Sequence, residues 1–196
     1  TEMGLPILPE YFEQYNRCNQ QVWKEFEQGA ITATDLRARR FCMLFDEIGL
    51  EADPEAISPV YLRYLSLGTF LLPGAEEVIR ALKTRFRLAL VTNGLADVQR
   101  PRLMNSKLRD CFERVFISEE LGVAKPAPAF FDTIFYQMGC PSRRETLIIG
   151  DSLTADMRGG RDYGIDTCWY NPAKLCTDFQ ATYTITVLSE LLHLLC

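Results

Sequence analysis

The spacing of hydrophobic residues divides the chain into two parts with different rhythms. From Pro9 to about Gly68, apolar residues recur three or four positions apart, beginning with Tyr11, Tyr15, Cys18, Val22 and Phe26. This spacing is typical of amphipathic helices, and with the flanking cap residues it predicts helices over residues 9–29, 32–49 and 53–68. No strand pattern occurs in this part, so we expect a small helical domain.

From Leu71 onward, apolar runs of strand length alternate with helical stretches. Strands are predicted within residues 87–94, 114–118, 146–150, 166–171 and 182–188, and helices near residues 95–106, 127–139 and 153–163. Continuous apolar strands indicate burial on both faces, and their alternation with helices indicates parallel pairing. The sequence therefore predicts a doubly wound α/β domain, in which ligands bind at the carboxyl ends of the strands.

Polar residues stand at those predicted strand ends. The first strand ends in Thr92, Asn93 and Gly94, the third is followed by Asp151 and then Asp156, and Lys125 lies in the loop after the second. Taken singly, each has an ordinary explanation as a helix cap, a turn residue or a solvated lysine. Taken together, they suit a phosphoryl group bound by the hydroxyl and the lysine, beside Mg²⁺ bound by the two carboxylates.

Three segments carry a resemblance to a known family. "LALVTNG", "GVAKPAPAFF" and "LIIGDSLTADMRGG" resemble motifs II, III and IV of the haloacid dehalogenase (HAD) superfamily. The resemblance implies a HAD-like Rossmannoid core over residues 70–196 and a helical cap domain over residues 1–69. "VFISEELGVAKPAP" and "NQQVWKEFEQGAIT" look closest to the pyrimidine 5′-nucleotidases of that superfamily. The implied activity is Mg²⁺-dependent hydrolysis of a small phosphomonoester, a nucleoside monophosphate, through an aspartyl-phosphate.

The same resemblance implies a role for each residue at the strand ends. Thr92 and Lys125 are expected to be catalytic, and they would bind the phosphorylated substrate together with Asn93 and Gly94. Asp151 is expected to ligate Mg²⁺, and Asp156 to support the metal site. Two other interpretations stay open: a haloacid dehalogenase, which needs no metal, and a non-catalytic HAD-like binding protein.

The superfamily's motif I, the D-x-D that carries the nucleophilic aspartate, is not found ahead of the helical region. "TEMGLPIL" contains no aspartate. "CMLFDEIGL" offers Asp46, but the second acid would fall on Ile48, and Phe41, Phe45 and Ile48 share one helix face, so Asp46 is interpreted as structural. We therefore expect the sequence to be a fragment whose central strand, between those ending at Thr92 and Asp151, lies outside it; a natural variant that lacks the nucleophile is the alternative.

The amino-acid composition argues mainly against certain partners, locations and kinds of chemistry. The 196 residues carry a net charge of −5 without a long basic run, which disfavours a nucleic acid polymer as partner. No run reaches the ~18 apolar residues of a membrane span, and no secretion signal is visible, so a cytoplasmic location is expected. The seven cysteines lack C-x-x-C spacing, which favours reduced thiols over disulfides or a zinc site. His193 is interpreted as a helix side chain, which argues against histidine-based chemistry; the oligomeric state is not indicated.

Overall fold

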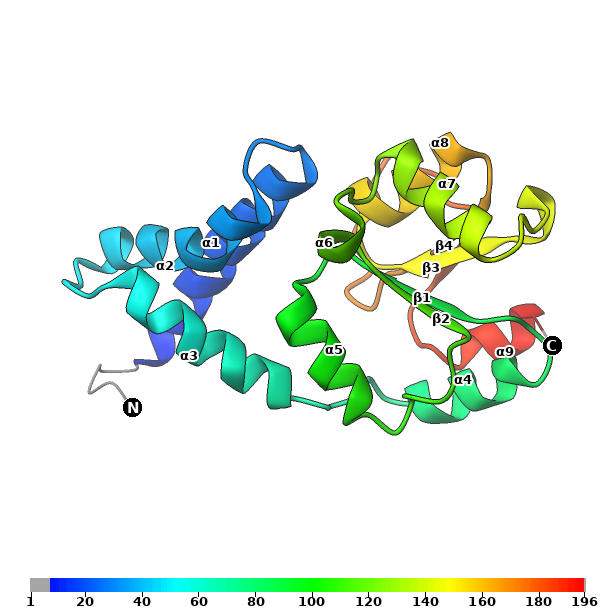
Figure 1. Cartoon of the computed structure of the whole chain (residues 1–196), viewed down its shortest axis with the longest axis horizontal. Helices are drawn as coiled ribbons and strands as arrows, with labels where there is room; N and C mark the ends of the chain where they lie inside the picture. Colours follow the sequence, from blue (N-terminus) through cyan, green and yellow to red (C-terminus); the bar gives the residue numbers. More distant parts are fainter. Residues whose placement is uncertain (1–7, 196) are drawn as a thin grey trace. The chain divides into compact units, whose positions relative to one another are not determined.

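The computed structural model describes residues 8–195, which divide into two units, one ending at Leu67 and one beginning at Gly68. The first unit consists of helices α1 (Pro9–Glu27), α2 (Ala33–Ile48) and α3 (Pro54–Leu67), and its described residues form no strand (Figure 1). The outer ends of the predicted domains, residues 1–7 and Cys196, lie outside the described residues.

The ends of α2 show why the sequence forms a helix there. Asp35 N donates to Thr32 Oγ1 at 3.2 Å, and Thr32 N donates to Asp35 Oδ2 at 2.8 Å. This reciprocal cap satisfies N–H groups that the first helical turn leaves without partners. The helix ends at Gly49, whose φ of 65° lies in the left-handed region that glycine adopts without steric cost.

The interior of the helical unit is apolar and aromatic. One buried cluster contains Cys18, Phe41, Leu44 and Phe45. Asp46 lies on α2 and is exposed, next to this cluster in sequence but outside it. The structure therefore places Asp46 in a helix, as the sequence predicts, and not at the end of a strand.

The second unit alternates short strands with helices, which confirms the predicted α/β fold class. Its strands are β1 (Ala89–Thr92), β2 (Arg114–Ile117), β3 (Leu147–Gly150), β4 (Asp166–Tyr170) and β5 (Tyr183–Ile185). Its helices are α4 (Ala75–Lys83), α5 (Ala96–Met104), α6 (Ser118–Leu121), α7 (Pro128–Gln137), α8 (Gly159–Tyr163) and α9 (Glu190–Leu195), with a 3₁₀ turn η1 (Arg143–Glu145) and a π-helical turn η2 (Leu153–Arg158).

All the strand pairs are parallel, but they form two ladders instead of one continuous sheet. Strand β1 pairs with β2, with Ala89 opposite Arg114. Strand β3 pairs with β4, and β4 pairs with β5. Within the described residues, β1 and β3 therefore belong to separate sheets, and each has one edge outside any ladder.

Helices cover both faces of these strands. In Figure 1, α7 and α8 lie on one side of the strands, and α4 and α9 lie on the other. The first side is filled by a cluster that includes Phe116 of β2, Ile148 of β3, and Phe130 and Met157 from the helical segments. Because Phe116 and Ile148 come from different ladders, the two ladders share one hydrophobic core.

One predicted helix differs in detail. The sequence predicts a regular helix over residues 153–163, but the structure has the π-helical turn η2 followed by α8. Met157 N donates to Ser152 O at 3.0 Å, the five-residue spacing of a π turn. A β-carbon on Gly160 would lie 2.5 Å from Ile148 Cγ2, so glycine there lets the start of α8 pack directly on β3.

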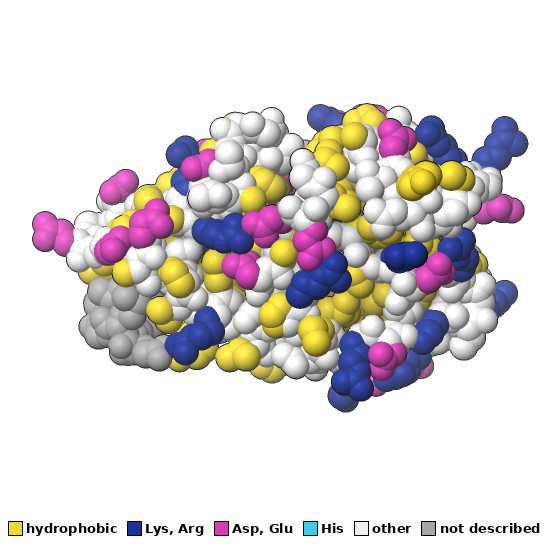
Figure 2. Space-filling view, in the orientation of Figure 1, with side chains coloured by type: hydrophobic (Ala, Val, Ile, Leu, Met, Phe, Trp, Pro, Cys, Tyr) yellow, Lys and Arg dark blue, Asp and Glu magenta, His cyan; other side chains and the backbone are white. Residues whose placement is uncertain are grey.

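The surface is charged and mixed in sign. On the face shown in Figure 2, Lys and Arg side chains lie among Asp and Glu side chains. In the described part of the chain, no helix has the length and apolar character that crossing a membrane would require.

Candidate functional site

A buried ion pair lies beside the carboxyl ends of β1 and β3. Lys125 Nζ is 2.6 Å from Asp156 Oδ1, and the two side chains are only 8% and 7% exposed. Lys125 Nζ also lies 3.5 Å from Val91 O in β1. Because burying two charges is costly unless the pairing geometry is good, this short contact fixes where the ammonium group can be. The protein thus holds a cation at the predicted phosphate-binding position.

Asn93 fixes the loop that carries Lys125. Asn93 Nδ2 donates to Lys125 O at 2.9 Å, and Lys125 N donates to Asn93 Oδ1 at 2.9 Å. Both residues are buried, so these two bonds join the end of β1 firmly to the loop. The Asn93 amide therefore has a positioning role in the structure, and its predicted contact with substrate stays a prediction.

Thr92 and Gly94 form a tight turn at the end of β1. Gly94 N donates to Thr92 Oγ1 at 2.9 Å, which leaves the hydroxyl hydrogen able to donate to an acceptor such as a phosphoryl oxygen. A β-carbon on Gly94 would lie 2.5 Å from Gln99 Nε2, so glycine allows the side chain of Gln99 to pack against the turn. This arrangement fits the predicted role of Thr92 as a hydrogen-bond donor.

Asp156 is held by the turn that follows β3. Ser152 N donates to Asp156 Oδ2 at 3.2 Å, while Ser152 Oγ accepts from Ala155 N at 3.0 Å and caps η2. A β-carbon on Gly150 would lie 2.2 Å from Asp156 Oδ2, so only glycine leaves room for that carboxylate. The two oxygens of Asp156 are thus directed toward Lys125 and toward the backbone at the end of β3.

Asp151 differs from Asp156 in its surroundings. It directly follows β3 and is exposed, and its backbone oxygen accepts from Trp169 Nε1 at 3.1 Å. The structure therefore joins Asn93, Lys125 and Asp156 by direct contacts, and it places Asp151 one residue from Ser152, which binds Asp156. Within residues 8–195, no group of three or more His, Cys, Asp or Glu residues could hold a metal ion.

Several contacts that hold the candidate site in place are not predicted by the sequence analysis. Ser152 occupies the N-cap position three residues ahead of Ala155, a signal that the sequence does contain. Glu119 Oε2 accepts from Ala96 N at 2.8 Å and so fixes the start of α5. The partner of Asp156 could not be predicted, because Lys125 lies 31 positions away in sequence.

Comparison with known proteins identifies the class. The model of the haloacid dehalogenase-like hydrolase family matches residues 7–164, and the chain belongs to this family of enzymes. HAD-hydrolase YfnB of Bacillus subtilis is 39% identical over 99% of this chain and 83% of its own length. Its crystal structure with bound magnesium has a TM-score of 0.93 to this structure and covers 99% of this chain and 86% of that one.

Two further relatives carry activities in their names. Pyrimidine 5′-nucleotidase PynA of Streptococcus pneumoniae is 38% identical over 99% of this chain and 83% of its own length. Pyrimidine 5′-nucleotidase YjjG of Escherichia coli is 33% identical over 100% of this chain and 87% of its own length. The predicted superfamily, and within it the likeness to pyrimidine 5′-nucleotidases, are confirmed by these matches.

Proposed function

We propose that this protein is a Mg²⁺-dependent phosphatase that acts on nucleoside 5′-monophosphates, with pyrimidine nucleotides as the substrate class. The buried pair between Lys125 and Asp156 carries the proposal, because it holds an ammonium group 3.5 Å from Val91 O, in the residue before Thr92 at the end of β1. Relatives that are 38% and 33% identical and named pyrimidine 5′-nucleotidases support the substrate class. They do not favour a dehalogenase or a non-catalytic protein.

Lys125 and Thr92 would bind the phosphoryl group. The ammonium group would donate to one phosphoryl oxygen and the Thr92 hydroxyl to another, so that both offset the negative charge that develops there. Asp156 would keep Lys125 in place, and Asn93 would hold the loop on which Lys125 lies. Gly94 would contribute its backbone to substrate binding, while Gln99 fills the space that a side chain at this position would need.

The carboxylates after β3 fit a magnesium ion in chemical type. Asp151 and Asp156 supply the hard oxygen donors that Mg²⁺ prefers, and a relative of similar structure binds magnesium. Asp151, which is exposed, would be the direct ligand, and Asp156 would support the site while bound to Lys125. When bound, the ion would supply charge stabilisation for the phosphoryl oxygens.

The nucleophile would come from a strand outside the 196 residues. Strands β1 and β3 belong to separate ladders, and Ile149 in the middle of β3 is 38% exposed. One further parallel strand between them, with flanking strands about 10 Å apart, would pair both edges and cover Ile149. An aspartate at its carboxyl end would attack phosphorus as the ester P–O bond breaks, and the leaving alkoxide would take up a proton. Water would then attack phosphorus, release phosphate and restore the carboxylate.

The helical unit is proposed to be the cap of this enzyme, with the cap over residues 1–69 and the core over residues 70–196. The cytoplasmic location also stays a proposal, supported by seven cysteines whose spacing does not favour disulfides.

Phosphate release by the complete natural protein tests the proposed function. Uridine and cytidine 5′-monophosphates should be hydrolysed with Mg²⁺ and not with EDTA, and faster than the corresponding purine nucleotides. Lys125→Met should lose activity by at least about a hundredfold. Asp162→Asn, which alters an exposed carboxylate elsewhere, should not. Release of halide from a 2-haloacid, or no release of phosphate from any nucleotide, would contradict the proposal. Turnover by residues 1–196 alone would contradict the external nucleophile.

A further inference from the structure

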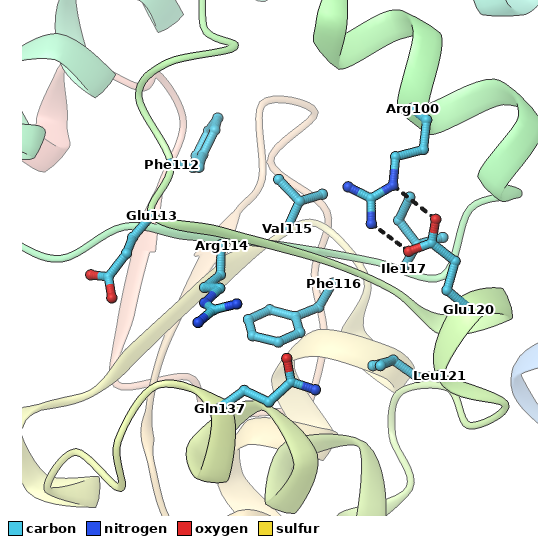
Figure 3. A pocket seen from close by; sticks show the side chains of 10 residues that line it. All are labelled: Arg100, Phe112, Glu113, Arg114, Val115, Phe116, Ile117, Glu120, Leu121 and Gln137. Carbon is cyan, nitrogen blue, oxygen red and sulfur yellow. Dashed lines mark hydrogen bonds and ion pairs between the residues drawn. The ribbon is translucent and has the colours of Figure 1, made fainter.

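The groove of about 380 Å³ shown in Figure 3 does not contain the candidate metal ligands. It is lined by residues between Phe112 and Leu121, in β2 and at its two ends, together with Arg100 and Gln137. Asp151, the proposed direct ligand, follows β3 and is exposed. Because Asp151 lies outside this groove and is exposed, the direction of its carboxylate depends on the backbone that carries it.

The peptide group between Asp151 and Ser152 is held at both of its polar atoms. Its carbonyl oxygen, Asp151 O, accepts from Trp169 Nε1 at 3.1 Å, and its nitrogen, Ser152 N, donates to Asp156 Oδ2 at 3.2 Å. A peptide group is planar, so these two contacts together fix the orientation of the plane. Rotation of that plane is the ψ angle of Asp151, and the contacts therefore also fix how the Asp151 side chain leaves the backbone.

Trp169 is itself held in place by the core. It lies on β4 opposite Gly150, the residue before Asp151, and is only 5% exposed. It belongs to the buried cluster that includes Ile148 and Met157. A buried indole N–H needs a hydrogen-bond acceptor, and here the acceptor is the Asp151 carbonyl. Since close packing restrains the ring, the ring holds the peptide group in place and does not follow its movements.

Trp169 also separates positioning from ligation in a way that Asp156 does not. The second oxygen of Asp156 pairs with Lys125 at 2.6 Å, so a change at Asp156 disturbs the proposed phosphate-binding lysine as well. Trp169 contributes an uncharged N–H from a neighbouring strand. A change at Trp169 therefore leaves both carboxylates and the lysine in the chain.

We propose that Trp169 is a positioning residue of the metal site, whose indole N–H orients the peptide group after Asp151 and so sets the direction of the Asp151 carboxylate. The inference rests on the proposed function, in which Asp151 is the direct ligand of Mg²⁺. Groups that hold metal ligands in place change metal affinity by about 10–100-fold when they are removed. Mg²⁺ requires near-ideal ligand geometry, so a misdirected carboxylate lowers its affinity.

Isothermal titration of the complete protein with Mg²⁺ tests the proposal. Trp169→Phe removes the N–H and should raise the dissociation constant by about tenfold. Trp23→Phe makes the same chemical change in the helical unit, on α1, and should leave the constant unchanged. Equal constants for Trp169→Phe and the unmodified protein would overturn this inference alone. Absence of Mg²⁺ binding by the unmodified protein would overturn the proposed function together with it.

Two further measurements keep the test decisive if the smaller ring of Trp169→Phe leaves a cavity that destabilises the fold. Benzothienylalanine in place of Trp169 keeps the bicyclic ring and replaces the N–H by sulfur, so it should raise the dissociation constant as Trp169→Phe does. An unchanged constant would show that the N–H only satisfies its own hydrogen-bonding need.

The second measurement uses the unmodified protein. The NMR resonance of the Trp169 indole N–H, identified by its absence when benzothienylalanine replaces Trp169, should shift as Mg²⁺ is added. The midpoint of this shift should agree with the calorimetric dissociation constant, because the N–H is bound to the residue that carries the ligand. A resonance that stays unchanged up to saturation with Mg²⁺ would overturn the proposal.

Discussion

Replacing Asp156 by asparagine removes one charge of the buried ion pair and leaves Lys125 as a buried cation. The pair is short, 2.6 Å, and its side chains are 8% and 7% exposed, so water cannot easily replace the lost carboxylate. Removing one partner of such a pair costs about 3–5 kcal/mol. Asparagine keeps the volume and a carbonyl oxygen, so we expect the free energy of unfolding to fall by about 3 kcal/mol, the lower end of that range.

Urea unfolding followed by circular dichroism measures this loss in the complete protein. The buffer should contain EDTA, because a bound metal ion would add its own stabilisation to one variant and not the other. A domain with about 5–15 kcal/mol of stability remains folded after this change, so the transition can be measured. Asp162→Asn is the matched control, since Asp162 pairs with Arg161 at 2.8 Å with both side chains 54% exposed; it should change stability by less than about 1 kcal/mol.

A double-mutant cycle with Lys125→Met separates the ion pair from other effects. Lys125→Met alone leaves Asp156 as an unpaired buried carboxylate, so it should also be destabilising. The double variant has no buried charge at this position and should lose much less than the sum of the two single losses. Additive losses, or a loss below about 1 kcal/mol for Asp156→Asn, would refute the conclusion that the pair is coupled and buried.

Four further predictions concern the metal ligands, Gly150 and the cysteines. Asp151→Asn should abolish Mg²⁺ binding measured by isothermal titration calorimetry, while Asp156→Asn should weaken it less; unchanged binding in Asp151→Asn would contradict its role as ligand. Gly150→Ala should lower phosphatase activity by about tenfold or more, because its β-carbon would lie 2.2 Å from Asp156 Oδ2 and displace that carboxylate; full activity would show that Asp156 can move freely. Burial raises the pKa of the Cys168 thiol to about 11 from 9.0, with Glu190 adding to the shift. Between pH 9 and 11 the folded state therefore keeps this proton while the unfolded state loses it. The contribution of Cys168 to the free energy of unfolding is fully present below pH 9 and is lost as the pH rises from 9 to 11. At pH 8.5 iodoacetamide should alkylate the exposed Cys42 much faster than Cys168, as measured by peptide mass spectrometry.

The sequence predicts the strands and most of the helices because each depends on local pattern, but helices α4 and α6 are not among the predicted elements. Thr32 and Gly49 are explicit signals for the limits of α2, and the apolar run ending at Gly150 is an explicit signal for β3. The sequence predicts a regular helix over residues 153–163 and not the π-helical turn, because the two differ only in the spacing of the backbone hydrogen bonds, such as Met157 N to Ser152 O. The candidate residues Thr92, Lys125, Asp151 and Asp156 are identified by the resemblance to motifs II to IV.

What the sequence could not predict is which of these residues bind one another. Asp156 has the character of a metal ligand in the sequence, yet in the structure its nearest partner is Lys125. Asn93 has the character of a substrate-binding residue, yet both atoms of its amide bind the backbone of Lys125. These pairings arise only when the strand ends converge, since the residues lie 31 and 32 positions apart.

The paired hydrogen bonds of Asn93 also affect how readily this residue undergoes deamidation. Asn93 precedes Gly94, and an asparagine followed by glycine is prone to deamidation, because the glycine nitrogen can attack the side-chain carbonyl and form a succinimide. Here Asn93 Oδ1 and Nδ2 are both bound to Lys125, and Gly94 N is bound to Thr92 Oγ1. The attacking nitrogen and the amide are thus held in place by the fold. If the Lys125 loop opened, deamidation would give an aspartate whose carboxylate faces the Lys125 carbonyl oxygen, and the loop could not close again in the same way.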